Sequence, residues 1–247
     1  MKYFLSLIII LLVSACAWFG YQYYRTDYVP NKHIRDAVVS QNELFLEMKP
    51  DVSEMNSDST GILDSCREIN SNCVGWISIP DTKIDFPIVQ GDDNDFYLHH
   101  GADDEYNYEV GCPFLDYRCN REFKDFNSVV YAHNMVDDMM FSDIEKFSDY
   151  EFMSSHQKGL LTLDDGVHEI DFFAYLSVMD TAYAYKTVFI TDKECDEFTE
   201  YLFTVAKHTM NVSEDEIKAT DEPHLILLST CTFEKDGARG ILAGIIS

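Results

Sequence analysis

The sequence predicts a mainly β fold, an antiparallel barrel or sandwich, preceded by helices and interrupted by one more helix near its end. From Cys73 onward, short runs rich in β-branched and aromatic residues alternate with turns marked by Gly, Pro, Asn and Asp. Aromatic residues are abundant (15 Tyr and 17 Phe) and only 6 Pro occur, which is typical of a folded chain. The length of 247 residues suits one domain of ordinary size plus an appendage. Eight strands are predicted, over residues 74–80, 84–90, 111–116, 128–133, 159–163, 168–180, 224–231 and 239–246.

The first 25 residues are predicted to form a membrane anchor. The apolar run from Phe4 to Gly20 has about 17 residues, the short end of a membrane span, and a tyrosine-rich stretch follows it. Lys2 before the run favours an N-terminus in the cytoplasm. A cleaved signal peptide and a lipoprotein signal with Cys16 as the lipidated residue are the alternatives. We therefore expect a single-pass protein of the cell membrane whose folded domain is extracellular.

Residues 26–72 are predicted to hold a linker and N-terminal helices, and residues 73–247 the β domain. A helix is expected over 32–48 because its apolar positions share one face, with a polar loop over 50–61 and a short helix over 62–69. That face consists of Ile34, Val38, Gln41, Phe45 and Met48.

A helix over 191–210 is predicted to interrupt the strands shortly before the one that ends in Cys231. Thr191 and Glu194 match a capping box at its start. Its expected buried face consists of Cys195, Phe198, Leu202, Val205 and Thr209.

The charge balance excludes several classes of partner. With 44 acidic and 18 basic residues the formal net charge is −26, so nucleic acid and anionic lipid are poor partners.

The seven cysteines contain no CxxC pair, and neither they nor the His99–His100 pair matches a zinc pattern. The stretch "GDDNDF" lacks the later Glu of a calcium loop. We predict no metal site, while the pairing of cysteines in disulfides stays open.

Three residues at predicted strand ends are candidates for catalysis. Cys231 ends one strand, Arg239 begins the next, and a hairpin of this length can return Arg239 close to Cys231. A thiolate nucleophile needs an acid/base partner and a stabiliser for the oxyanion. His133, at the end of another apolar strand, can serve as the acid/base, and Arg239 can stabilise negative charge.

These residues lie in motifs that resemble those of the sortases, the cysteine transpeptidases of Gram-positive cell surfaces. The motifs are "LSTC" at 228–231 followed by Arg239, and "VVYAHNM" around His133. The segments 75–100 and 111–120, and the helix before the cysteine-bearing strand, resemble class B in particular. The resemblance covers about residues 33–247.

The resemblance implies an eight-stranded sortase-type β-barrel and a His133, Cys231 and Arg239 active site without a metal or organic cofactor. It implies that the thiolate cleaves a C-terminal sorting motif after Thr, and that a thioacyl-enzyme then passes the protein to an amine. The expected partners are surface proteins with such a motif and an amine of a peptidoglycan cross-bridge or its lipid-linked precursor. The resemblance also predicts a substrate-binding role for Asn94, Leu98, Tyr131, Ser229 and Thr230.

Two other functions remain open at this point. A pilin-polymerising sortase would use the same chemistry with a lysine amine as the acceptor. A surface binding module on a sortase-like barrel would carry out no catalysis. The reactivity of Cys231 and the choice of acceptor amine would distinguish these alternatives.

Overall fold

The computed structural model describes residues 2–25, 32–49, 61–107, 110–135, 139–179, 182–218, 220, 222–231 and 238–247. Its helices are α1 (Lys2–Tyr23), α2 (Lys32–Met48), α3 (Gly61–Ile69), α4 (Phe96–His99), η3 (Ser142–Ser148), α5 (Tyr150–Ser155), η4 (Tyr183–Tyr185), α6 (Asp192–Val205) and α7 (Glu214–Lys218). Its strands are β1 (Cys73–Ser78), β2 (Asp85–Val89), β3 (Phe114–Leu115), β4 (Asn127–Tyr131), β5 (Asn134–Met135), β6 (Met139–Met140), β7 (Lys158–Leu163), β8 (Gly166–Met179), β9 (Ala206–Thr209), β10 (His224–Cys231) and β11 (Ala238–Ile246).

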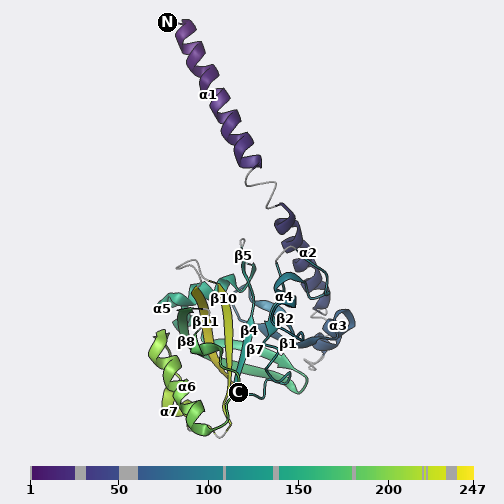
Figure 1. The fold of residues 1–247 in the computed structure, drawn as a ribbon, viewed down its shortest axis with the longest axis vertical. Coiled ribbons are helices and arrows are strands. Elements are labelled where there is room, and N and C mark those ends of the chain that lie inside the picture. The colour runs from purple at the N-terminus through teal and green to yellow at the C-terminus, as the bar shows by residue number, and fades with distance from the viewer. Residues whose placement is uncertain are drawn as a thin grey trace.

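Eight strands form a closed barrel (Figure 1). They are hydrogen-bonded in the order β11-β10-β4-β3-β2-β1-β7-β8, and pairing between β8 and β11 closes the ring. The short strand β9 pairs with residues 174–176 of β8. Each of the eight predicted strands corresponds to one of the barrel strands, so the barrel prediction is confirmed.

The prediction of a purely antiparallel sheet is wrong for two strand pairs. β10 pairs with β4 in parallel, and so does β2 with β3. Parallel neighbours require a long crossover connection. The chain between β4 and β10 supplies one, since it contains β7, β8 and α6, and α4 lies in the connection between β2 and β3.

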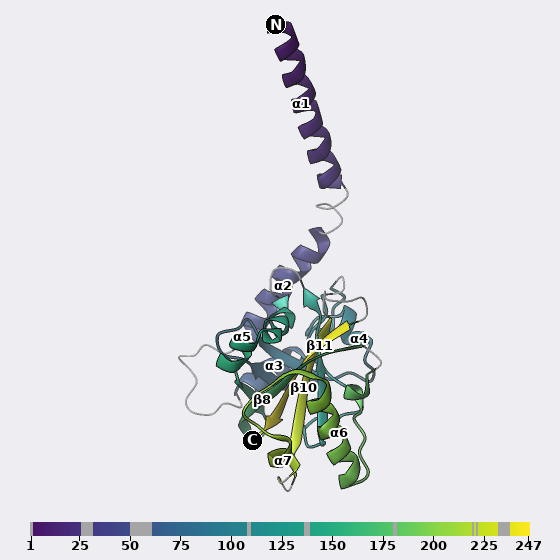
Figure 2. The same ribbon diagram turned by 90° about the vertical axis from the view of Figure 1, so that its left-hand side faces the viewer.

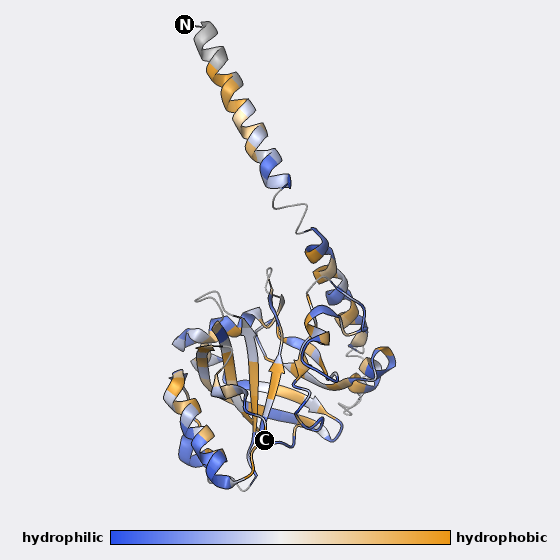
Figure 3. Cartoon of the chain, viewed as in Figure 1, coloured by the Kyte–Doolittle hydropathy of each residue, from blue (hydrophilic) through white to orange (hydrophobic). Residues whose placement is uncertain are grey.

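Strand β10 is buried on both faces, which explains its unbroken apolar sequence. Ile226 and Leu228 belong to the main core of the barrel, and Leu225 and Leu227 belong to a second core on the other face. Phe198 of α6 contributes to that second core, because α6 covers the outside of the barrel (Figure 1, Figure 2). Figure 3 shows the corresponding pattern, with apolar residues concentrated in the strands and hydrophilic residues on α6 and α7.

The helix predicted over 191–210 ends earlier than expected, at Val205. Residues 206–209 instead form β9, which pairs with β8 in antiparallel register, because Ala206 adopts an extended backbone conformation. The predicted cap is present: the Thr191 hydroxyl accepts from the Glu194 N–H at 3.3 Å, and the Glu194 carboxylate accepts from the Ile190 N–H at 2.7 Å.

The N-terminal helices α2 and α3 pack on the barrel as part of one core. The buried side of α2 contains Val38, Gln41, Phe45 and Met48 as predicted, whereas Ile34 is half-buried. Residues 26–31 of the expected linker and residues 50–60 of the loop expected over 50–61 lie outside the described residues, and Gly61 begins α3.

The expectation of a membrane anchor is wrong. No helix in the described ranges has both the length and the apolar character that crossing a bilayer requires. In α1 the apolar run gives way to Tyr21, Gln22 and Tyr23 before about 20 apolar residues have accumulated. The predicted localisation as a single-pass membrane protein is corrected accordingly.

Candidate active site

The strand register brings the three catalytic candidates to one rim of the barrel. In the antiparallel pair β10–β11, Cys231 lies directly opposite Arg239. In the parallel pair β10–β4, Ser229 lies beside Tyr131, and Cys231 and His133 each follow two residues later. Adjacent strands therefore carry all three candidates to the same edge. Of Cys231 the structure describes the backbone, and residues 232–237 lie outside the described residues.

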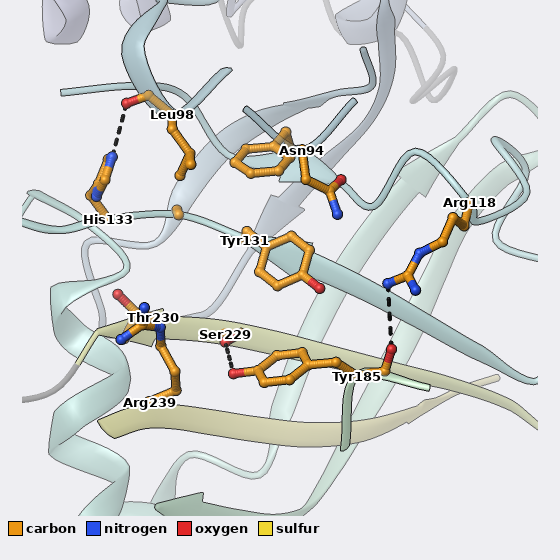
Figure 4. Close-up of a pocket in the computed structure, with 11 residues that line it drawn as sticks. Asn94, Leu98, Arg118, Tyr131, His133, Tyr185, Ser229, Thr230 and Arg239 are labelled. Atoms are coloured by element: carbon orange, nitrogen blue, oxygen red, sulfur yellow. Dashed lines mark hydrogen bonds between the residues drawn. The ribbon is translucent and has the colours of Figure 1, made fainter. Parts of the chain in front are cut away.

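A pocket of about 460 Å³ opens at this rim (Figure 4). Its lining residues are Asn94, Leu98, Phe114, Arg118, Tyr131, Ala132, His133, Tyr185, Ser229, Thr230 and Arg239. The structure thus brings together the five residues that we predicted to bind substrate with two of the three catalytic candidates. In Figure 4 the His133 and Arg239 side chains lie at one end of the pocket and Arg118 lies at the other.

The His133 ring is held by backbone. Its Nε2 lies 2.9 Å from the Leu98 carbonyl oxygen, and since a carbonyl can only accept, Nε2 carries the hydrogen in this contact. The half-buried Arg239 also contacts backbone, because its Nη1 donates to the Ala238 carbonyl at 3.2 Å. Both side chains are thereby oriented before any substrate binds.

A buried carboxylate, Asp116, organises the opposite end of the pocket. Its Oδ1 accepts from the Arg118 Nε at 2.8 Å, and its Oδ2 accepts from the Arg118 Nη2 at 2.7 Å, the Asn94 Nδ2 at 2.9 Å and the Tyr131 hydroxyl at 3.1 Å. Burial by itself raises the pKa of Asp116, but the hydrogen bonds from Arg118 and Asn94 together outweigh it, so the pKa lies below its usual value. Asp116 is therefore an ionised group inside the protein, paired with Arg118.

Aromatic rings form the side of the pocket between its two ends. The rings of Tyr131 and Tyr185 stack with centroids 5.8 Å apart, and the ring centroids of Phe114 and Tyr131 are 5.3 Å apart. The Tyr185 hydroxyl is 2.9 Å from the Ser229 hydroxyl. Burial raises the pKa of Tyr131, so its hydroxyl remains a donor.

Thr230, next to Cys231, is buried, and its hydroxyl has no hydrogen-bond partner in the described part of the chain. It alternates with Ser229 along β10, so the two side chains leave opposite faces of the strand. Thr230 follows Ile226 and Leu228 toward the interior of the barrel.

Sequence reasoning missed Asp116, Arg118 and Tyr185. A signal for the first two was present, because in "GCPFLDYRCN" an Asp directly follows the apolar residues of a predicted strand and an Arg stands two residues after it. For Tyr185 no signal beyond the aromatic composition of its segment was available.

Neither metal ligation nor disulfide bonding is evident among the described residues. They contain no group of three or more His, Cys, Asp or Glu side chains that could hold a metal ion. The six cysteines whose side chains are described are free thiols: Cys16, Cys66, Cys73, Cys112, Cys119 and Cys195.

Comparison with known proteins identifies similar chains with similar folds. The chain is 32% identical to sortase B of Listeria monocytogenes over 212 residues, which are 85% of this chain and 82% of that protein. A crystal structure of Clostridium perfringens sortase B superposes with a TM-score of 0.67 at 26% identity, covering 74% of this chain and 98% of that one. A Streptococcus pyogenes class B sortase involved in pilus biogenesis gives a TM-score of 0.65 at 27% identity, covering 74% and 97% respectively. No family model matches the chain.

Proposed function

The chain belongs to the class B sortases, which are cysteine transpeptidases, and we propose that it cleaves a C-terminal sorting motif after Thr and transfers the acylated protein to a cell-wall amine. The observation that carries this proposal is the register that aligns Cys231, Arg239 and His133 at the rim of one pocket.

In the first half-reaction the Cys231 thiolate attacks the carbonyl carbon of Thr. Arg239 donates to the oxygen on which negative charge develops, which a fixed cation does without exchanging a proton. The C–N bond then breaks, and His133 gives a proton to the departing amine, leaving a thioester on Cys231. Two observations support these roles. The Leu98 carbonyl oxygen holds the His133 ring at Nε2, and Arg239 lies opposite Cys231 on the next strand.

In the second half-reaction an incoming amine attacks the thioester carbon. His133 takes the proton from this amine, the C–S bond breaks, and Cys231 leaves as the thiolate. We propose an amine of a peptidoglycan cross-bridge or of its lipid-linked precursor as the acceptor. The proposed steps use side chains alone and involve no metal or organic cofactor.

A pilin-polymerising function is the second candidate. The structural similarity to the Streptococcus pyogenes class B sortase involved in pilus biogenesis favours it. This candidate uses a lysine side chain as the acceptor in place of a peptidoglycan amine. Supplying one purified acceptor at a time, a cross-bridge peptide or a lysine-bearing peptide, distinguishes the two by the mass of the product.

Substitution of Cys231 tests the proposed chemistry. We expect Cys231→Ala to abolish cleavage of a fluorogenic pentapeptide library in which Thr precedes the scissile bond, because none of the six described thiols lines the pocket and could replace it. Hydroxylamine should accelerate the cleavage by the unsubstituted enzyme, since it captures the thioester. Release of the fluorophore with time is the measurement.

The matched control is Cys195→Ala, which removes the half-buried thiol of α6 and should leave the rate unchanged. Cleavage that persists in Cys231→Ala contradicts the proposal. A folded, unsubstituted enzyme that binds peptides without cleaving any of them supports the third function, a binding module without catalysis.

A further inference from the structure

Arg118 lies at the end of the pocket opposite His133, and its guanidinium is held in place by Asp116 (Figure 4). Arg118 uses Nε and Nη2 on the Asp116 carboxylate and also donates from Nη2 to the Tyr185 carbonyl at 3.4 Å. Asp116 has no exposed surface, whereas the Arg118 side chain is 40% exposed. A bidentate pair of this kind fixes the plane of the guanidinium.

One nitrogen of this guanidinium, Nη1, takes part in none of these contacts. Among the residues that the structure describes, Nη1 of Arg118 donates to no acceptor, although Arg118 lines the pocket. Arginine side chains bring five N–H donors to a site, so an oriented guanidinium with a free edge can bind an oxygen acceptor.

The part of the substrate that reaches Arg118 follows from the proposed function, on which this inference rests. The residues after Thr leave in the first half-reaction, and the acceptor amine must enter where they left. The residues before Thr stay attached to Cys231 through both steps, so the pocket must hold these upstream residues.

We propose that Arg118 is a specificity-determining residue that donates from Nη1 to a carbonyl oxygen of the sorting peptide upstream of Thr, and that Asp116 is the positioning residue that holds it there. The preferred acceptor is an uncharged carbonyl, because Asp116 already neutralises the Arg118 charge. Asp116 also orients two other residues that line the pocket, since Asn94 and Tyr131 donate hydrogen bonds to its Oδ2.

The test measures binding without turnover. In the Cys231→Ala background, fluorescence anisotropy gives the Kd of labelled Thr-containing peptides, shortened one residue at a time from the N-terminus. We expect Arg118→Lys to weaken binding of the longest peptide about ten-fold, because it loses one charge-assisted hydrogen bond. The difference between the two proteins should vanish once the residue that bears the bound carbonyl has been removed.

Asp116→Asn should raise the Kd of the longest peptide by a similar factor. The double variant Asp116→Asn/Arg118→Lys should bind this peptide only slightly more weakly than Asp116→Asn alone. The matched control is Arg121→Lys, an exposed arginine outside this pocket, which should not change Kd. Thermal unfolding of each variant separates a loss of folded protein from a loss of contact.

Three outcomes overturn the inference: an unchanged Kd in Arg118→Lys, an equal loss for every peptide length, or no binding of any peptide to the Cys231→Ala protein. Failure of the proposed function gives a different result. In that case peptides bind in an Arg118-dependent manner, but the unsubstituted enzyme does not cleave them.

Discussion

At the scale of single residues, Gly111 determines how close His133 comes to the backbone around Leu98. Gly111 has φ +67°, a left-handed conformation that favours glycine. A Cβ atom there would lie 2.7 Å from the Tyr97 carbonyl oxygen, 3.0 Å from the Leu98 carbonyl oxygen and 3.1 Å from His133 Cδ2. The His133–Leu98 contact at 2.9 Å therefore requires that position 111 lack a side chain.

We expect Gly111→Ala to lower kcat/KM about ten-fold or more, since a displacement of about 1 Å in an acid/base group is costly. The loss should appear in kcat, because the upstream end of the pocket is untouched. Steady-state kinetics with a fluorogenic sorting peptide measures this. Gly61→Ala is the control, because a Cβ at Gly61 meets nothing within 4 Å. Equal kinetics for the two variants would show that Gly111 does not position His133.

The candidate catalytic residues could be predicted from sequence because each ends or begins an apolar strand within a motif. The full role of Asp116 could not, because two of its donors lie far away along the chain. Asn94 and Tyr131 are separated from it by 22 and 15 residues. The substrate-binding roles of Asn94, Leu98, Tyr131, Ser229 and Thr230 stay predictions, although all five line the pocket.

At the scale of elements, α6 shows that the local sequence determines where a helix begins but not where it ends. Its start was predictable, because Thr191 and Glu194 form a local hydrogen-bonding unit that involves only adjacent residues. Its end was not, because the apolar spacing continues to Thr209 while pairing with β8 draws residues 206–209 into a strand. A distant partner strand overrides a local helical pattern.

We expect Thr191→Ala to lower the free energy of unfolding by about 1 kcal/mol, because the first turn of α6 loses its side-chain acceptor. Urea denaturation monitored by circular dichroism measures the change. Thr191→Ser keeps the hydroxyl and should retain most of the stability. If the Ala and Ser variants are equally stable, the cap contributes nothing to the fold.

At the scale of the whole molecule, the eight barrel strands were predictable one by one, but their arrangement was not. The local alternation of apolar and polar residues identifies a strand, but it does not determine which other strands that strand pairs with. The parallel pairing of β4 with β10 joins segments about 100 residues apart, and it is this pairing that aligns His133 with Cys231. The pocket is therefore formed when the barrel closes, because its lining residues come from parts of the chain that are far apart in sequence.

The proposed thioacyl intermediate is tested most directly by the intact mass of the enzyme after incubation with a cleavable sorting peptide and no acceptor amine. We expect a mass increase equal to the acyl fragment that ends in Thr, located on Cys231 by proteolytic mapping and removed by hydroxylamine. Cleavage without any covalent adduct, or an adduct on a cysteine other than Cys231, would contradict the proposed mechanism.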